Sequence, residues 1–534
     1  METSNLYRLN HFMNQYGINM DSLTKLFNLK LNQITTTENG AKAYETTGEY
    51  NLDLFTNIIR GINDKLLLEF IQKAWIENPK TFLKIMRHTR DCRTGKGERD
   101  VFYRMALWLR ENDFETYILN IGTMVSEDGY FKDLINIAKY LREKNIEYKY
   151  ELRLLAQFLV EDILKFKKNN KDISLCAKWC PTFNDSLDKK YNFTKQFVTI
   201  LFTDLNFNEE WIIKRYQILN LYKNRYMESY RKEILKPLRK HLNIVENLMS
   251  SRNFNNILFQ SVPAKAMLNY RKAFIKQVPN KYNEYLSNLI KGEVKVNISG
   301  LMPHELVSKV YIENDILIEQ QFKELVKKYK DSGTLQRTLS IVDVSGSMSG
   351  IPMKVAIAMG LFTSLIPDEN DQFYKKIITF SENPQFHKVK GETLHQMVNN
   401  IKHIEWGMST NIEKVFRLIL DSGKMFNLTQ EQMPLKIIIY TDMEFNQATR
   451  NDTNYEIIKQ LYEENGYQLP KIIFWNLRAS SKAFPIKGST PNTALLSGYS
   501  AELLKGIMED IINPIQIMNK ILEKYIVFIN NSDI

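Results

Sequence analysis

The sequence predicts a two-part protein of 534 residues, with an all-α segment over residues 1–334 and an α/β domain over residues 335–534. In the first part, apolar residues recur at helical spacing. In the second, short apolar runs alternate with helix-like segments, which is typical of a mostly parallel, doubly wound sheet covered on both faces. The charge also changes at this boundary: 52 basic and 40 acidic residues precede it, and 20 basic and 21 acidic residues follow it.

The first part reads as a basic module of helical repeats. The stretch "DKLLLEFIQKAWIENPKTFLKIMRHTR" predicts two amphipathic helices, with Pro79 just inside the start of the second. Pro237 should break or kink a later helix. Short polar loops join these helices, as in stacked helical repeats, although the sequence shows no clean period.

The second part reads as a Rossmann-like α/β domain. Its predicted strands are Leu339–Val344, Lys376–Phe380, Leu435–Tyr440, Lys471–Asn476 and Ala494–Leu496. Its predicted helices are Met353–Ile366, Leu394–Ile401, Ile412–Leu420, Tyr455–Glu464 and Ala501–Glu509. In such sheets, ligands bind beyond the carboxyl ends of the strands.

A polar turn follows the first of these strands in "TLSIVDVSGSMSG". Asp343, Ser345 and Ser347 supply a carboxylate and two hydroxyls, which are hard oxygen ligands suited to Mg²⁺, Mn²⁺ or Ca²⁺. Three groups are too few for an octahedral ion, so other strand ends should contribute. Thr410 in "WGMSTN" and Asp442 in "IIIYTDMEF" are the candidates. Mg²⁺ is the preferred ion.

Two other interpretations of the same turn stay open. The stretch also matches the G-x-S-x-G pattern of hydrolases, with Ser349 as nucleophile. That mechanism needs an acid and then a histidine later in the chain, and the later histidines are His387, His395 and His403. Alternatively, Ser347 or Ser349 simply caps a helix.

The five candidate ligands resemble the metal-ion-dependent adhesion site (MIDAS) of von Willebrand factor A domains. The resemblance rests on the D-x-S-x-S turn of Asp343, Ser345 and Ser347, followed by Thr410 and Asp442 in the same chain order. It implies that these residues hold a divalent ion, some of them through water. It also implies that an acidic group of a protein partner fills the free coordination position.

Longer blocks resemble an uncharacterised family of eukaryotes and giant DNA viruses. They include "RDCRTGKGERDVFYRMALWL", "VPAKAMLNYRKAF", "LMPHELV" and "IIFWNLR". That family joins a helical module to a von Willebrand A domain, and it is in turn similar to the Telomerase-Ro-Vault (TROVE) proteins, whose helical rings bind small RNAs. The resemblance implies RNA binding by the helical module and no established enzymatic activity.

The basic excess of the first part independently suits a polyanion such as RNA. In "RDCRTGKGER" the candidate phosphate contacts are Arg90, Arg93, Lys96 and Arg99. The alternative is that these side chains cap helix ends and pair with Asp91, Glu98 and Asp100. The loop lacks the G-x-x-x-x-G-K-[ST] spacing of a nucleotide-binding loop.

The location and the function class follow from what the sequence contains. In "METSNLYRLNHF" no basic segment is followed by an apolar core, so we expect no secretory signal. The apolar stretch from Val355 to Ile366 is too short to span a bilayer. Three cysteines form no even disulfide framework, so we expect free thiols in an intracellular, cytoplasmic protein, or in a virion if the source is viral. We expect a non-enzymatic RNA-binding scaffold; the alternatives are a protein-interaction or structural protein without RNA, and a hydrolase.

Overall fold

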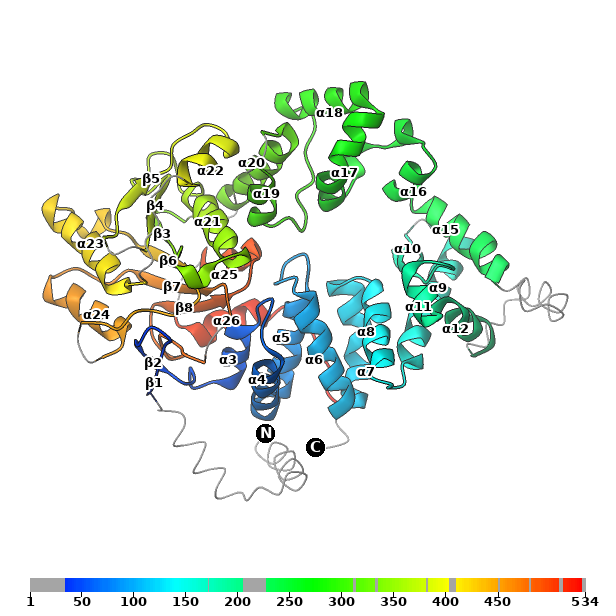
Figure 1. Ribbon diagram of the computed structural model, residues 1–534, viewed down its shortest axis with the longest axis horizontal. Helices are drawn as coiled ribbons and strands as arrows, with labels where there is room; N and C mark the ends of the chain where they lie inside the picture. The colour runs from blue at the N-terminus through cyan, green and yellow to red at the C-terminus, as the bar shows by residue number, and fades with distance from the viewer. Residues whose placement is uncertain are drawn as a thin grey trace, which may run out of the picture. The chain divides into compact units, whose positions relative to one another are not determined.

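The computed structural model describes residues 34–170, 172–204, 227–310, 314–331, 335–380, 383–402, 410–449, 452–479, 482–508 and 512–530. The chain forms two compact units (Figure 1). Unit 1 comprises Met1–Val101, Pro263–Asn269 and Tyr285–Ile534, and unit 2 comprises Phe102–Val262 and Tyr270–Glu284. The units therefore divide the chain differently from the boundary at residue 334 that the sequence suggests.

The centre of unit 1 is a six-stranded sheet with the order β5-β4-β3-β6-β7-β8. The strands are β3 (Thr338–Val342), β4 (Lys376–Thr379), β5 (Phe386–Lys388), β6 (Lys436–Thr441), β7 (Lys471–Asn476) and β8 (Thr493–Ser497). All neighbouring pairs are parallel except β4 and β5. The chain runs outward in opposite directions from β3 and β6, so the predicted mostly parallel α/β sheet is confirmed, with β5 as an edge strand that the sequence did not indicate.

The sheet is the core of unit 1, and burial extends from its central strands to the edge strand β8. Every residue of β3, β6 and β8 is buried. Buried parallel strands read as unbroken apolar runs, which is why the sequence identified them. The helices of this part are α21 (Ile351–Ser364), α22 (Leu394–Lys402), α23 (Ile412–Met425), α24 (Asn454–Glu464), α25 (Lys505–Met508) and α26 (Pro514–Leu522), with short turns η6 (Gly346–Met348), η7 (Gln430–Gln432) and η8 (Ala501–Leu504).

Residues 34–101 belong to the same unit as the sheet. They form the strands β1 (Ile34–Thr36) and β2 (Lys42–Tyr44) and the helices α3 (Tyr50–Asn57), α4 (Asp64–Glu77) and α5 (Pro79–Arg90). The antiparallel β1–β2 pair corrects the expectation of an all-α first part; β-branched residues at 34–37 and a left-handed Gly40 (φ 83°) favour this hairpin. Unit 1 also contains α19 (Pro303–Val310) and α20 (Ile316–Asp331).

Backbone and side-chain hydrogen bonds attach this N-terminal part to the α/β part. Tyr44 and Phe484 exchange two backbone hydrogen bonds, of 2.9 and 2.8 Å. The hydroxyl of Thr37 donates to the carbonyl of Phe445 at 2.7 Å. Asn476, the last residue of β7, donates its side-chain amide to the carbonyl of Thr56 in α3 at 3.3 Å. These contacts lie in the interior of unit 1, so residues 34–101 are a structural part of it.

Unit 2 is helical in its described residues. It holds most of α6 (Arg99–Asn112), then α7 (Phe114–Thr123), η1 (Met124–Asp128), α8 (Lys132–Glu143), α9 (Lys149–Lys167), α10 (Cys176–Trp179), α11 (Ser186–Tyr191), α12 (Phe193–Thr199) and η2 (Ile200–Asp204). It continues with η3 (Tyr230–Leu235), α15 (Lys236–His241), α16 (Val245–Ser250), η4 (Phe254–Asn256) and η5 (Phe259–Ser261). Helices α17 (Ala264–Gln277) and α18 (Pro279–Lys291) belong partly to each unit. Pro237 follows the π-helical turn η3, where its missing N–H is accommodated.

Candidate metal centre

Two carboxylates stand at the same edge of the sheet, directly after neighbouring strands. Strands β3 and β6 are parallel, and their register pairs Val342 with Tyr440. Asp343 therefore follows β3 at the level where β6 is about to end, and Asp442 follows the last residue of β6. Both side chains are buried, at 0% and 1% exposure. Adjacent parallel strands thus bring together two acids that lie far apart in the sequence.

The turn after β3 folds back on Asp343. Its Oδ1 accepts a 3.0 Å hydrogen bond from the backbone N–H of Ser345. The 3₁₀ turn η6 follows, and it places the hydroxyl oxygens of Ser345 and Ser347 3.0 Å apart. Two hydroxyls beside a carboxylate form the compact group of hard oxygens that the D-x-S-x-S spacing predicts.

Asp442 has one carboxylate oxygen that lacks a partner. Its Oδ1 accepts a 3.1 Å bond from the N–H of Glu444, whereas Oδ2 is buried and has no hydrogen-bond partner among the described residues. The next residue, Met443, has a left-handed backbone (φ 69°), which is uncommon for a bulky side chain. A buried carboxylate oxygen without a donor is unfavourable unless a cation completes it.

The pKa of Asp343 also favours a cation beside the two carboxylates. Burial, and after it the negative charge of Asp442, raise the pKa of Asp343 to about 6. Hydrogen bonds from Ser345 and Thr441 oppose this shift. Two buried acids that repel each other need a proton or a cation between them, and oxygen donors favour a hard divalent ion.

Thr410 is the fifth predicted ligand, and it lies beside the segment that follows β6. Its carbonyl accepts a 3.1 Å bond from the N–H of Asn446, and its side chain is buried. Asn411 then caps α23 by accepting from the N–H of Lys414 at 2.9 Å. The described residues contain no group of three or more His, Cys, Asp or Glu placed to hold a metal. The donor set is therefore two carboxylates with hydroxyls.

Two residues near the turn were missing from the sequence prediction. Thr441 donates its hydroxyl to Oδ2 of Asp343 at 2.8 Å. Arg478, which is exposed just after β7, donates from its guanidinium to the carbonyl of Ser347. Thr441 directly precedes Asp442 in the sequence "YTD" at the end of a predicted strand, so the sequence already placed it near the site. Nothing in the sequence around Arg478 signals its contact with a turn 131 residues away.

The predicted phosphate contacts fall into two classes. Arg93 and Arg99 are exposed, and they remain candidate phosphate contacts. Arg90 and Lys96 are 0% exposed, which corrects their assignment, because a side chain in the interior of unit 1 cannot meet a phosphate in solvent. The Nζ of Lys96 donates to the carbonyls of Phe55 and Ile58 and to the hydroxyl of Ser497. Burial lowers the pKa of this amine to about 7.

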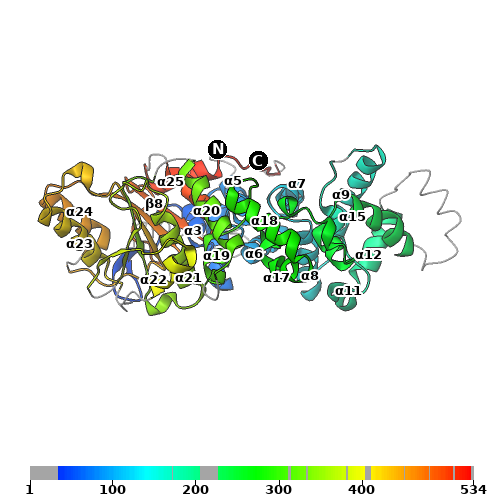
Figure 2. The ribbon, with the colours of Figure 1, turned by 90° about the horizontal axis from the view of Figure 1, so that it is seen from above.

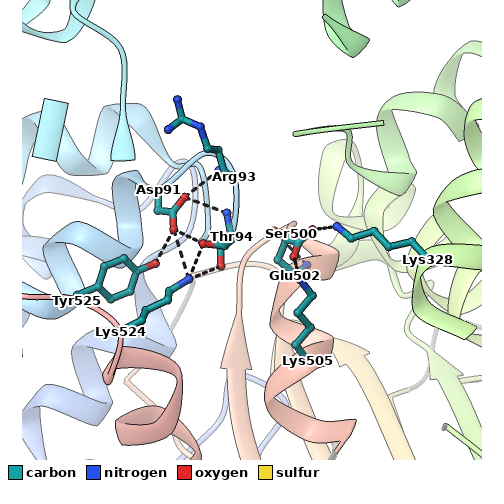
Figure 3. A network of polar contacts seen from close by, with 9 residues as sticks. All are labelled: Asp91, Arg93, Thr94, Lys328, Ser500, Glu502, Lys505, Lys524 and Tyr525. Carbon is teal, nitrogen blue, oxygen red and sulfur yellow. Dashed lines mark hydrogen bonds and ion pairs between the residues drawn. The ribbon is translucent and has the colours of Figure 1, made fainter. Parts of the chain in front are cut away.

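The loop after α5 is held by the C-terminal segment (Figure 3). Asp91 accepts hydrogen bonds from the N–H groups of Arg93 and Thr94, both at 2.9 Å, and from the hydroxyl of Tyr525 at 2.8 Å. Lys524 bonds to the side chains of Asp91 and Thr94. Burial favours the neutral form of Asp91, but the hydrogen bonds from Thr94, Arg93 and Tyr525 outweigh it and lower the pKa to about 2. Asp91 is therefore fully engaged in anchoring the chain.

Figure 3 also shows a second anchor in the same unit. Glu502 accepts from Lys328 of α20 at 2.5 Å and pairs with Lys505 at 2.8 Å, and its backbone N–H donates to the hydroxyl of Ser500. Two lysines on one carboxylate lower its pKa. This cluster ties α20 to η8 and α25, and its single carboxylate already has two lysine partners.

The hydrolase alternative finds no assembled triad among the described residues. The ring of His387 contacts the hydroxyl of Thr379, and His395 contacts the carbonyl of Val310 and the side chain of Asn399. His403 lies outside the described residues. Neither described histidine is bonded to Ser349, which is the exposed residue after η6.

Comparison with known proteins gives the family. A model described as a domain of unknown function, DUF2828, matches residues 37–152 and 147–335, and another, DUF7788, matches residues 337–522. The chain is 33% identical over 535 residues to "Uncharacterized protein L728" of Acanthamoeba polyphaga mimivirus, covering 93% of this chain and 89% of that protein. The chain belongs to the DUF2828 family. This confirms the predicted kinship with uncharacterised proteins that have a giant-virus member.

Two further findings concern the helices and the cysteines of this DUF2828 protein. In the described residues, no helix is both long and apolar enough to cross a membrane. Cys92, Cys176 and Cys180 are free thiols, and the sulfur atoms of the last two are 3.8 Å apart.

Proposed function

We propose that this DUF2828 protein is a non-enzymatic binding protein with a divalent-cation site at the edge of the unit 1 sheet. The ligands are Asp343, Ser345, Ser347, Thr410 and Asp442. The cation is Mg²⁺, with Mn²⁺ or Ca²⁺ as the alternatives for the same oxygen donors. The observation that carries the proposal is the buried Oδ2 of Asp442, which has no partner among the described residues.

The resemblance to von Willebrand factor A domains supports the same assignment. The five candidate ligands occur in the expected order, and four of them lie on the turns after two adjacent parallel strands. In the proposal, an acidic side chain of a protein partner completes the coordination, and the chain acts as a scaffold inside the cell or in a virion. In this function the protein binds its partner without catalysing a reaction.

Calorimetry tests the site directly. Mg²⁺ and Mn²⁺ are titrated into the full chain and into the variants Asp343→Ala and Asp442→Ala, and we expect binding heat from the wild type but not from these two variants. Asp421→Ala is the matched control, because Asp421 is an exposed acid of the same unit on α23. Unchanged cation binding in Asp343→Ala would eliminate the site.

RNA binding is the second candidate function, and the charge of unit 2 favours it. Unit 2 contains 30 Lys and Arg against 21 Asp and Glu, a net charge of +9, whereas the rest of the chain has a net charge of +2. A basic helical unit suits a phosphate backbone, and the resemblance to TROVE proteins agrees. The alternative is a structural or protein-binding role without RNA, which a salt titration of labelled RNA against the full chain distinguishes.

A further inference from the structure

Two helices of unit 2, α9 and α15, carry four of its exposed lysines. Lys165 and Lys168 lie at the C-terminal end of α9, and Lys236 and Lys240 lie on α15. All four side chains are exposed. We call these four residues the α9–α15 lysine surface.

An aromatic contact brings the two helix ends together. The rings of Phe166 on α9 and His241 on α15 have centroids 5.3 Å apart and meet edge to face at 75°. Each ring belongs to a residue directly adjacent to a lysine of the surface, Lys165 or Lys240. Figures 1 and 2 both show α9 and α15 next to each other in space. The helix segments that carry the lysines are therefore close in space, although Lys165 and Lys236 are 71 positions apart in the sequence.

The surface is held in place by its own unit. Arg239, on α15, donates to the carbonyl of Ala177 at 2.8 Å and to the carbonyl of Cys180 at 3.3 Å. Two acids precede Lys165 on α9: Asp162 is buried and accepts two hydrogen bonds from Ser174, whereas Glu161 is exposed one turn before Lys165. Within the described part of unit 2, Lys168, Lys236 and Lys240 form no ion pair.

Helix electrostatics explain only part of this arrangement. Lysines near the C-terminus of α9 interact favourably with its dipole, which accounts for Lys165 and Lys168. Lys236 differs, because η3 runs directly into α15 and places it in the middle of a continuous helical stretch. A lysine there gains nothing from the dipole. Its exposure beside Lys240, one turn on, is the feature that suggests a ligand.

We propose that the α9–α15 lysine surface is where single-stranded RNA binds, with phosphates on the four lysines and bases against the half-buried rings of Phe166 and His241. This inference rests on the second proposed function and gives it a location. Sites for single-stranded nucleic acid combine exposed cationic side chains with aromatic rings. The cations bind the phosphates, and the unpaired bases stack on the rings. An acidic protein segment would use the lysines but not the rings.

A salt titration of a fluorescein-labelled single-stranded RNA against the full chain tests the surface. The test variant combines Lys165→Gln, Lys168→Gln, Lys236→Gln and Lys240→Gln. The charge-matched control combines Lys80→Gln, Lys295→Gln, Lys327→Gln and Lys390→Gln, four exposed lysines of unit 1. The test variant should lose up to about 2.8 from the logarithmic salt slope, at about 0.7 per phosphate contact, and the control should lose none.

The outcomes separate this inference from the function on which it rests. If the wild type shows no salt-dependent affinity, RNA binding itself fails. If the wild type binds and the test variant keeps its slope, RNA binding stands and the surface is wrong. A quadruple Lys→Arg variant of the same positions keeps the charge and should keep the slope, which guards against misfolding. Equal displacement of the RNA by poly-glutamate would assign the surface to an acidic protein instead.

Discussion

The hydroxyl of Thr441 donates a 2.8 Å hydrogen bond to Oδ2 of Asp343, and so ties the last residue of β6 to the first residue after β3. Because Asp442 is the next residue, this bond fixes the two candidate metal carboxylates relative to each other. It also stabilises the charged form of Asp343 against the effect of burial, which raises the pKa of that carboxyl.

Replacing Thr441 by valine should destabilise the protein and weaken the cation site. Valine keeps the shape but removes the donor, and a buried hydrogen bond to a charged group contributes about 1.5–3 kcal/mol. Urea unfolding in the presence of a chelator measures the loss. Thr441→Ser retains the hydroxyl and should recover most of it. Equal free energies of unfolding for the valine and serine variants would contradict a role for the hydrogen bond.

Replacing Asp442 by asparagine should have opposite effects with and without the cation. In a chelator, the variant should be more stable than the wild type, because it removes a buried charge that opposes Asp343. In Mg²⁺, the wild type should gain about 2.7 kcal/mol at a concentration 100 times its dissociation constant, and the variant should gain nothing. Melting temperatures in both buffers check this. A cation-dependent gain in the variant would contradict the assigned ligand.

The sequence predicted most of the sheet because buried parallel strands leave an unbroken apolar run. Strand β7 was predicted with its bounds, Lys471–Asn476, whereas β5 was missed. Strand β5 is a three-residue, antiparallel edge strand with no fully buried residue, so it leaves neither an apolar run nor a long alternation. Asp343 and Asp442 were predicted together because the carboxyl ends of neighbouring parallel strands meet at one edge.

The sequence pattern could not predict that residues 34–101 belong to the same unit as the sheet. An amphipathic helix shows that one face is buried, but not which element covers it. Lys96 illustrates the limit, since a lysine in a basic loop is expected in solvent. It is buried because the carbonyls of Phe55 and Ile58 and the hydroxyl of Ser497 supply its acceptors. The first two acceptors lie about 40 residues away and the last about 400.

A fragment that begins at residue 335 should therefore fold poorly by itself. It would leave β8 without α3, and it would lose the backbone pairing of Tyr44 with Phe484 and the bond from Thr37 to Phe445. We expect the fragment 335–534 to be aggregated or to lack a cooperative melting transition. Co-expression with residues 34–101 should improve its yield and give a transition. A monomeric fragment with a sharp transition would show that the N-terminal part is dispensable.

Lys96 should make the stability of the protein depend on alkaline pH. Its pKa falls from 10.5 to about 7 in the folded state because burial disfavours the charged amine. Between these values the unfolded chain binds a proton that the folded chain does not, so the free energy of unfolding should rise with pH across this window. The slope for one full proton is about 1.4 kcal/mol per pH unit at 25 °C.

Lys96→Met should remove this contribution, whatever its effect on stability at neutral pH. Methionine has no titrating group, so the difference in free energy of unfolding between wild type and variant should grow in favour of the wild type from about pH 7 to 10. Lys80→Met is the control, because Lys80 is exposed on α5 and its loss should leave the slope unchanged. Urea unfolding at half-unit pH steps gives both slopes. Parallel curves for the wild type and Lys96→Met would show that this amine stays protonated in the folded protein, held by its three oxygen acceptors.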